Sequence, residues 1–198
     1  MKFRKTLKIT SRTSSVTNGF VQAIIPCLHP TDEESAAALA VLGIDPNKLT
    51  CIYCGASATD WDHLRPLVKG KRPTGYFTGV QNLVPACGPC NQSKGGQEWR
   101  VWIQGPAKGS PKSRGIADLP SRVATLEAFE TWSAHDRIAM REIVGADAWD
   151  QYWARLQTIE DLMQAAQREA VSIRGRIASA LSKALTELGT NSAPEPSA

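Results

Sequence analysis

The chain has 198 residues, a formal net charge of +4, and 42% hydrophobic and 21% charged residues. These values are normal for a globular protein, and the lack of a run of about 18 apolar residues argues against a membrane span. The basic start is not followed by an apolar segment, so we expect no secretory signal and a cytoplasmic location, where close cysteine pairs favour metal over disulfides.

Positive charge is concentrated in two parts of the chain. Residues 1–31 carry five basic residues and no acid, and residues 63–117 carry nine basic residues against Glu98 alone. A solvated face accounts for many such runs. Here the second run overlaps a motif, which favours contact with phosphates, because phosphate neutralisation supplies much of the affinity for nucleic acids. We therefore expect a polyanionic partner.

The first 48 residues predict a basic arm followed by a helix. Short strands are indicated at 7–10 and 20–25, before Pro26. Thr31 and Glu34 form a capping-box pattern, which predicts a helix that begins after Thr31 and stops at Gly43. Cys27 is interpreted as a core or inert cysteine.

Two Cys-x-x-Cys steps, Cys51/Cys54 and Cys87/Cys90, mark the next region, residues 49–103. Their spacing predicts a structural zinc site, in which each thiolate lies about 2.3 Å from the metal. Four thiolates close the coordination shell, so this zinc would join a hairpin to a helix without taking part in chemistry. The helix is expected to open at Asn91.

Polar residues of a different kind lie between and beside the cysteines. Asp62 and Asn91 offer oxygen ligands, which suit Mg²⁺ or Mn²⁺ and not zinc. His63 is adjacent to Asp62, and neighbouring side chains of an extended backbone point to opposite sides. We therefore assign Asp62 to a cation and His63 to an attacking water, because a histidine with a pKa near 6.5 is a suitable general base.

The rest of the chain predicts a Gly/Pro-rich linker at 104–120, a helical region at 121–188 and a disordered tail at 189–198. Apolar residues from Trp149 to Leu188 recur at steps of three and four, which defines one helix face. A single helix of this length would reach roughly 60 Å. Its apolar face is expected either to form a homodimer seam or to pack back on the helix predicted at 122–135.

The motif region resembles the HNH nuclease family, the ββα-metal fold, in its four-cysteine zinc-bearing form. The resemblance covers residues 51–94 and is carried by Cys51-Ile-Tyr-Cys54, Asp60-Trp-Asp-His-Leu-Arg-Pro66 and the run from Asn82 to Lys94. It implies an α+β fold with a small ββα-metal module, flanked by the N-terminal arm and helix and by the C-terminal helical region. The flanks are not covered.

The resemblance also implies roles for individual residues. His63 is the general base and Asn82 orients it, while Asp62 and Asn91 bind one catalytic divalent cation. Asn91 stands where the family name has its second histidine, a common variant, so the choice between Mg²⁺ and Mn²⁺ stays open. From the basic run itself, the residues expected near the nucleic acid are Arg65, Lys69, Lys71, Arg72, Tyr76 and Lys94. For Arg65 and Lys94 a surface salt bridge is an equal alternative, and Tyr76 would otherwise pack over its own hairpin.

The implied function is a DNA endonuclease, in which His63 takes a proton from the water that attacks phosphorus. The compact size and the added helices fit a restriction-type enzyme, and a homing-type nickase or a toxin nuclease is the alternative within this class. A homodimer would favour double-strand cleavage and a monomer would favour nicking. The alternative is a non-catalytic zinc-knuckle DNA-binding protein, which leaves Asp62, His63, Asn82 and Asn91 unexplained. A helical partner-binding protein with a decayed nuclease module is a third interpretation, but no catalytic position has been lost.

Overall fold

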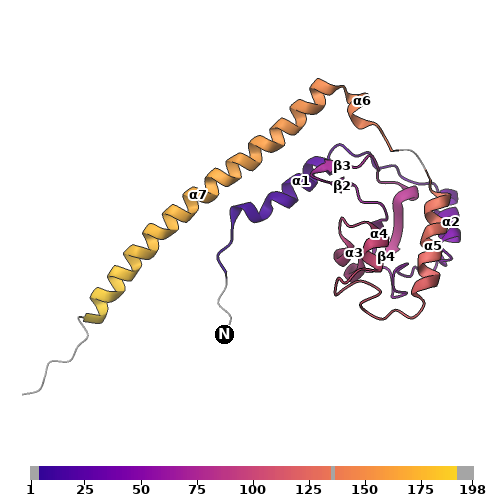
Figure 1. Cartoon of the computed structure of the whole chain (residues 1–198), viewed down its shortest axis with the longest axis horizontal. Helices are drawn as coiled ribbons and strands as arrows, with labels where there is room; N and C mark the ends of the chain where they lie inside the picture. Colours follow the sequence, from indigo (N-terminus) through magenta and orange to yellow (C-terminus); the bar gives the residue numbers. More distant parts are fainter. Residues whose placement is uncertain (1–4, 135–136, 191–198) are drawn as a thin grey trace, which may run out of the picture. The chain divides into compact units, whose positions relative to one another are not determined.

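The computed structural model describes residues 5–134 and 137–190. These residues divide into two compact units, one made of residues 5–17 and 146–190 and the other of residues 18–134 and 137–145 (Figure 1). The second unit contains α2 (Asp32–Val41), β1 (Asp60–His63), β2 (Val68–Lys69), β3 (Arg72–Pro73), β4 (Leu83–Ala86), α3 (Gly88–Lys94), α4 (Trp99–Ile103), α5 (Leu119–Trp132) and α6 (Met140–Val144).

A two-stranded hairpin followed by a helix lies at the centre of this unit. β1 pairs antiparallel with β4, with Asp60 opposite Ala86 and His63 opposite Leu83. α3 follows β4 after one residue, so the predicted ββα arrangement is confirmed. The helix begins at Gly88 rather than at Asn91, because Pro89 fits the first turn, where its missing N–H is not needed.

Aromatic side chains fill the core behind the hairpin. Tyr53, Trp99 and Trp102 are almost completely buried, and the rings of Tyr53 and Trp102 meet edge to face with centroids 5.0 Å apart. α2 and α5 lie side by side and pack on the same core through Leu39 and Phe129, among other residues (Figure 1). This core gives the short hairpin the support that an isolated hairpin lacks in water.

The capping box predicted for α2 is present. The backbone N–H of Glu34 donates to Thr31 Oγ1 at 3.2 Å, and the N–H of Thr31 donates to Glu34 Oε2 at 2.8 Å. Gly43 follows the helix with φ +64°, a left-handed conformation that terminates the helix. The start and the end of this helix are therefore confirmed.

The strands predicted at 7–10 and 20–25 are wrong. The chain instead forms a 3₁₀ turn, η1 (Ile9–Arg12), which continues into α1 (Thr13–Gln22). Thr17 and Val21, one helical turn apart, are both buried. In the second predicted strand, residues 20–22 end α1 and residues 23–25 form a turn, so packing of the helix at Val21 overrides its β-propensity.

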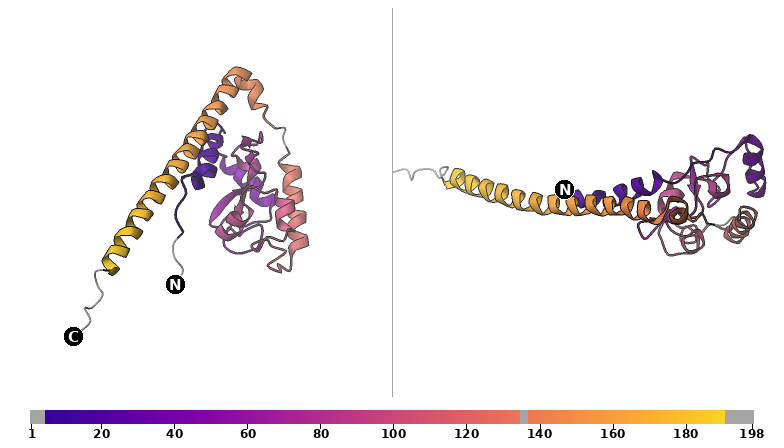
Figure 2. Two further views of the ribbon diagram at one scale, coloured as in Figure 1. Left: turned by 60° about the vertical axis from the view of Figure 1, so that its left-hand side comes forward. Right: turned by 90° about the horizontal axis from the view of Figure 1, so that it is seen from above.

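Most of the first unit is α7 (Ala146–Thr190), which is one continuous helix (Figure 2). The prediction of a long C-terminal helix is therefore confirmed. The N–H of Ile9 donates to Gln167 Oε1 at 2.7 Å, and the hydroxyl of Thr17 donates to Glu160 Oε1 at 3.3 Å. None of the described helices combines the length and apolar character needed to cross a membrane. Residues 191–198 of the expected tail, and His135 of the expected helix, lie outside the described residues.

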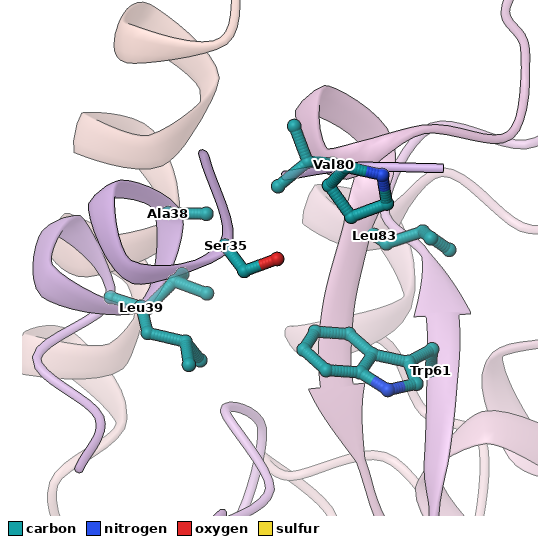
Figure 3. Close-up of a pocket in the computed structure, with 8 residues that line it drawn as sticks. Ser35, Ala38, Leu39, Trp61, Val80 and Leu83 are labelled. Carbon is teal, nitrogen blue, oxygen red and sulfur yellow. The ribbon is translucent and has the colours of Figure 1, made fainter. Parts of the chain in front are cut away.

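An apolar cavity of about 220 Å³ lies between α2 and the outer face of the hairpin. Figure 3 shows Trp61 and Leu83 on the hairpin side, opposite Ala38 and Leu39 of α2. Trp61 is 49% exposed, whereas its neighbour Asp62 is only 5% exposed. The alternation along β1 thus sends the indole toward α2 and the carboxylate into the domain.

Candidate functional site

The four cysteines of the motif converge on one point. Cys51 and Cys54 lie in the turn before β1, Cys87 caps α3, and Cys90 lies in the first turn of that helix. Their four sulfur atoms lie within 4.8 Å of one another, and the Cys54 and Cys87 sulfurs are 3.7 Å apart. Tetrahedral bonds of about 2.3 Å to zinc would separate the sulfurs by about 3.8 Å. The donor set and its spacing therefore fit a structural zinc site.

Local geometry explains why the first cysteine pair forms a tight turn. The N–H of Gly55 donates to the carbonyl of Cys51 at 2.8 Å, and the N–H of Cys51 donates to the carbonyl of Ala56 at 2.6 Å. Gly55 has φ +77°, and a Cβ there would lie 2.7 Å from Arg122 Nη2. Only glycine satisfies both the backbone conformation and this close approach.

Two arginines beyond the motif donate hydrogen bonds to residues of the cysteine cluster and its turn. Arg114 donates from Nη1 to the sulfur of Cys90 at 3.2 Å. Arg122 donates from Nη1 to the carbonyls of Cys51 and Ile52 at 3.3 and 2.9 Å. A guanidinium beside four thiolates offsets negative charge, and its donated hydrogen bond is charge-assisted. Sequence reasoning missed both arginines, because neither has a fixed spacing from the cysteines.

Asp62 is held by two partners inside the domain. The hydroxyl of Tyr53 donates to Asp62 Oδ2 at 2.6 Å. The ammonium of Lys94 lies 3.0 Å from Oδ2 and 3.2 Å from Oδ1, and it also donates to the carbonyl of His63 at 2.7 Å. Lys94 is 1% exposed, so this ion pair is buried. Oδ1 accepts one of these bonds, which leaves it a lone pair for a further cation.

The imidazole of His63 is directed to a different partner. His63 Nε2 lies 2.9 Å from Thr78 Oγ1. Burial lowers the pKa of His63 from its usual value, and the positive charge of Lys94 acts in the same direction, against the opposing effect of Asp62. The ring is therefore neutral at physiological pH and able to accept a proton. Sequence reasoning missed Thr78, which is 15 residues from His63 with no motif to mark it.

Asn82 is buried beneath this region and organises the backbone. Its Oδ1 accepts from the N–H of Arg65 at 2.8 Å, and its Nδ2 donates to the carbonyls of Arg65 and Phe77 at 3.0 and 3.3 Å. Its own carbonyl accepts from the N–H of Leu64 at 2.8 Å. Asn82 thus fixes the chain on either side of the histidine pocket, while the direct bond to His63 comes from Thr78.

A cavity of about 250 Å³ is bordered by three of the four residues expected to be catalytic, and Asn82 is not among its lining residues. Asp62, His63 and Asn91 all border it, although Asp62 and His63 have different hydrogen-bond partners. The remaining lining residues are Asn18, Gln22, Pro66, Leu67, Val68, Gly95 and Gly96. A carboxylate, an amide and a neutral imidazole around one cavity form a donor set that suits a hard divalent cation beside a general base.

Two of the residues expected near nucleic acid are engaged inside the domain. Arg65 donates to the carbonyls of Gln81 and Glu130, each at 3.0 Å, and to Ser133 Oγ at 3.1 Å. Lys94 is buried against Asp62. Both cations therefore support the fold where the sequence suggested phosphate contacts.

The other basic candidates lie on a small exposed hairpin. β2 and β3 pair through Lys69 and Arg72, and the turn residues Gly70 and Lys71 have φ +56° and +62°. Two successive positive φ values are typical of a type I′ turn. Lys69, Lys71 and Arg72 are exposed, and Val68 at the base of the same hairpin borders the cavity. Positive charge thus stands beside the candidate site.

Tyr76 lies between two guanidinium groups. The Cζ atoms of Arg65 and Arg137 lie 5.5 and 5.3 Å from the centroid of the Tyr76 ring, within the range of cation–π interactions. The N–H of Ile138 donates to the carbonyl of Gly75 at 2.9 Å, so the segment after α5 returns to this loop. The ring is half-buried and serves these internal contacts.

Comparison with known proteins identifies the region that contains the site. Residues 51–97 match the family model described as HNH endonuclease. No curated protein and no solved structure gives a significant match to the chain. The matched segment contains all four clustered cysteines and Asp62, His63, Asn82 and Asn91. The sequence resemblance to this family is therefore confirmed for the motif region.

Purified protein is expected to carry about one zinc ion per chain, measured by elemental analysis. Cys90→Ser should lose most of this zinc and unfold at lower temperature, because zinc binding contributes directly to folding of such sites. The matched control is Cys27→Ser, since Cys27 is exposed and lies outside the cluster. Full zinc content and an unchanged melting temperature in Cys90→Ser would contradict the assignment.

Proposed function

Taking residues 51–97 as an HNH endonuclease domain, we propose that the protein is a divalent-cation-dependent DNA endonuclease of the restriction type. The observation that carries the proposal is the single cavity bordered by Asp62, His63 and Asn91, next to the four-cysteine cluster. A zinc-binding scaffold alone needs no such set. Hydrolysis of a phosphodiester needs a base, a hard cation and a place for the phosphate.

His63 is assigned the proton transfer. When Nε2 carries the hydrogen donated to Thr78, Nδ1 keeps a lone pair that accepts a proton from water. The resulting hydroxide attacks phosphorus, and a P–O ester bond breaks. Thr78 fixes the ring, and Asn82 fixes the backbone around it.

Asp62 and Asn91 are the residues that would hold Mg²⁺ or Mn²⁺. The bound cation would supply electrostatic stabilisation of the negative charge that develops on the phosphate. Lys94 and Tyr53 hold the Asp62 carboxylate in place without occupying all of its acceptor sites.

The hairpin of β2 and β3 is proposed to contact the DNA backbone. Lys69, Lys71 and Arg72 are exposed on it, and its base borders the cavity. Contacts to phosphates position a protein on DNA without reading the sequence. These contacts would therefore add affinity for DNA without a sequence preference.

Helix α7 is proposed to pair with α7 of a second copy. Ile173, Ile177, Leu181 and Leu185 are 54–67% exposed and lie on one face at steps of four. Most helical stability in proteins comes from packing of an apolar face, so this exposed face favours a partner. Residues 160–170 hold three acids and one base, whereas residues 171–187 hold three bases and one acid. An antiparallel pair would set these opposite charges against each other.

A second candidate function is a zinc-knuckle DNA-binding protein without catalysis. The observation that favours it is the Lys94–Asp62 ion pair, because an ammonium already neutralises the carboxylate expected to bind a cation. This candidate predicts DNA binding without cleavage. A cleavage assay with a histidine variant separates the two functions.

In a plasmid assay with Mg²⁺ or Mn²⁺, His63→Ala is expected to lose cleavage by a factor of about 10² or more, as expected for removal of a general base. DNA binding, measured by fluorescence anisotropy, should be retained. His29→Ala is the matched control, because His29 is exposed and outside the cavity. Binding without cleavage by all three proteins would support the second candidate.

The rate of cleavage should fall at low pH with a midpoint below 6.5. The pKa of His63 is lowered by burial, so the neutral base persists to lower pH than a solvent-exposed histidine would allow. The measurement is the single-turnover rate against pH at saturating metal. A midpoint above 6.5 would show that another group, or a charged His63, controls the rate.

Leu181→Glu is expected to lower the dimer fraction at least tenfold, measured by sedimentation or light scattering over a concentration series. A charge within an apolar seam must lose water without a partner. Ser179→Glu is the matched control, because it adds the same charge two residues away on the opposite side of the helix. A monomeric wild type would refute the α7 dimer.

A further inference from the structure

Tyr53 lies inside the turn that carries the first cysteine pair, one residue before Cys54 and two after Cys51. Its side chain is completely buried. The ring meets Trp102 edge to face at 5.0 Å, and the hydroxyl donates to Asp62 Oδ2 at 2.6 Å. A residue of the cysteine turn is thus bonded directly to the carboxylate that borders the candidate catalytic cavity.

The backbone around Tyr53 has little freedom. The N–H of Ile52 donates to the carbonyl of Pro85 in β4 at 2.9 Å, and the N–H of Cys54 donates to the carbonyl of Cys51 at 3.3 Å. The Arg122 guanidinium donates hydrogen bonds to the carbonyls of Cys51 and Ile52. The position of the phenol is therefore set by the shape of the cysteine turn, and a zinc ion would fix that shape.

The two partners of Asp62 act differently on its carboxylate. Lys94 approaches both oxygens, at 3.2 and 3.0 Å, and attracts the group as a charge. Tyr53 contacts Oδ2 alone and so selects one rotation of the carboxylate plane. Oδ2 faces both donors, whereas Oδ1 faces Lys94 alone, so Oδ1 keeps more capacity for another cation.

We propose that Tyr53 is a positioning residue that couples the four-cysteine site to the catalytic cation. Its hydroxyl holds the Asp62 carboxylate in the rotation that presents Oδ1 to Mg²⁺ or Mn²⁺. This inference rests on the proposed function of Asp62 as a cation ligand. Loss of such a hydrogen bond to a metal ligand typically weakens metal binding by about 10–100-fold.

The test measures Mn²⁺ binding by calorimetry on protein that carries one zinc ion per chain. Tyr53→Phe removes only the hydroxyl and is expected to weaken Mn²⁺ binding by about 10–100-fold. The Mn²⁺ concentration for half-maximal cleavage should rise by a similar factor, with a nearly unchanged rate at saturating Mn²⁺. Tyr152→Phe in α7 is the matched control and should bind Mn²⁺ as the wild type does.

A second variant separates the hydrogen bond from general destabilisation. Replacing Tyr53 by 4-aminophenylalanine keeps the ring and restores an N–H donor at the same position, and it should recover most of the Mn²⁺ affinity. Wild-type affinity in Tyr53→Phe, or equal weakening in the Phe and amino variants, would overturn the proposal.

Asp62→Asn serves as the reference for the cation site itself. If Asp62→Asn binds Mn²⁺ as tightly as the wild type, Asp62 is not a cation ligand, and both the inference and the proposed cation site fail. If only Asp62→Asn loses affinity while Tyr53→Phe retains it, the cation site stands and the role of Tyr53 alone is refuted.

Discussion

The convergence of four cysteine sulfurs is the constraint on which the rest of the domain depends. It joins the turn before β1 to the start of α3. Asp62 of β1 and Asn91 of α3 thereby come to border the same cavity. A two-stranded hairpin with a seven-residue helix has too little apolar surface to fold alone. A zinc ion held by the four cysteines would supply the missing stabilisation, and the packing of α2 and α5 supports the hairpin from behind.

Buried charge in the domain is arranged around the cavity. Lys94 lies between the Asp62 carboxylate and the carbonyl of His63, so one ammonium satisfies an acid and a backbone acceptor. Breaking a buried pair of this kind leaves an uncompensated charge, which is strongly destabilising. His63 faces Thr78 instead and stays neutral. The separation of a charged carboxylate from a neutral base fits a site in which one group holds a cation and the other accepts a proton.

Much of this site could be predicted from the sequence, because spacing encodes it. Two Cys-x-x-Cys steps predicted the cluster, and Thr31 with Glu34 predicted the start of α2, since both depend on local geometry. Contacts made by residues distant in sequence could not be predicted: Thr78 on His63 and Arg114 on Cys90 follow no fixed interval. The burial of Lys94 could not be predicted from the sequence either. Lys94 was therefore expected to contact a phosphate, whereas the structure pairs it with Asp62. Residues 7–10 and 20–25 were mistaken for strands because their β-branched and aromatic residues suit either structure.

Hydrogen exchange with and without zinc shows whether the four-cysteine cluster holds the hairpin and α3 together. Removing zinc with a chelator is expected to abolish amide protection along β1, β4 and α3, while α7 stays protected near its hydrogen bonds to η1 and α1. Restoring zinc should restore protection in all three elements together. Unchanged protection of β1 and β4 in zinc-free protein would contradict the account, because the hairpin and the site would then form without the four-cysteine cross-link.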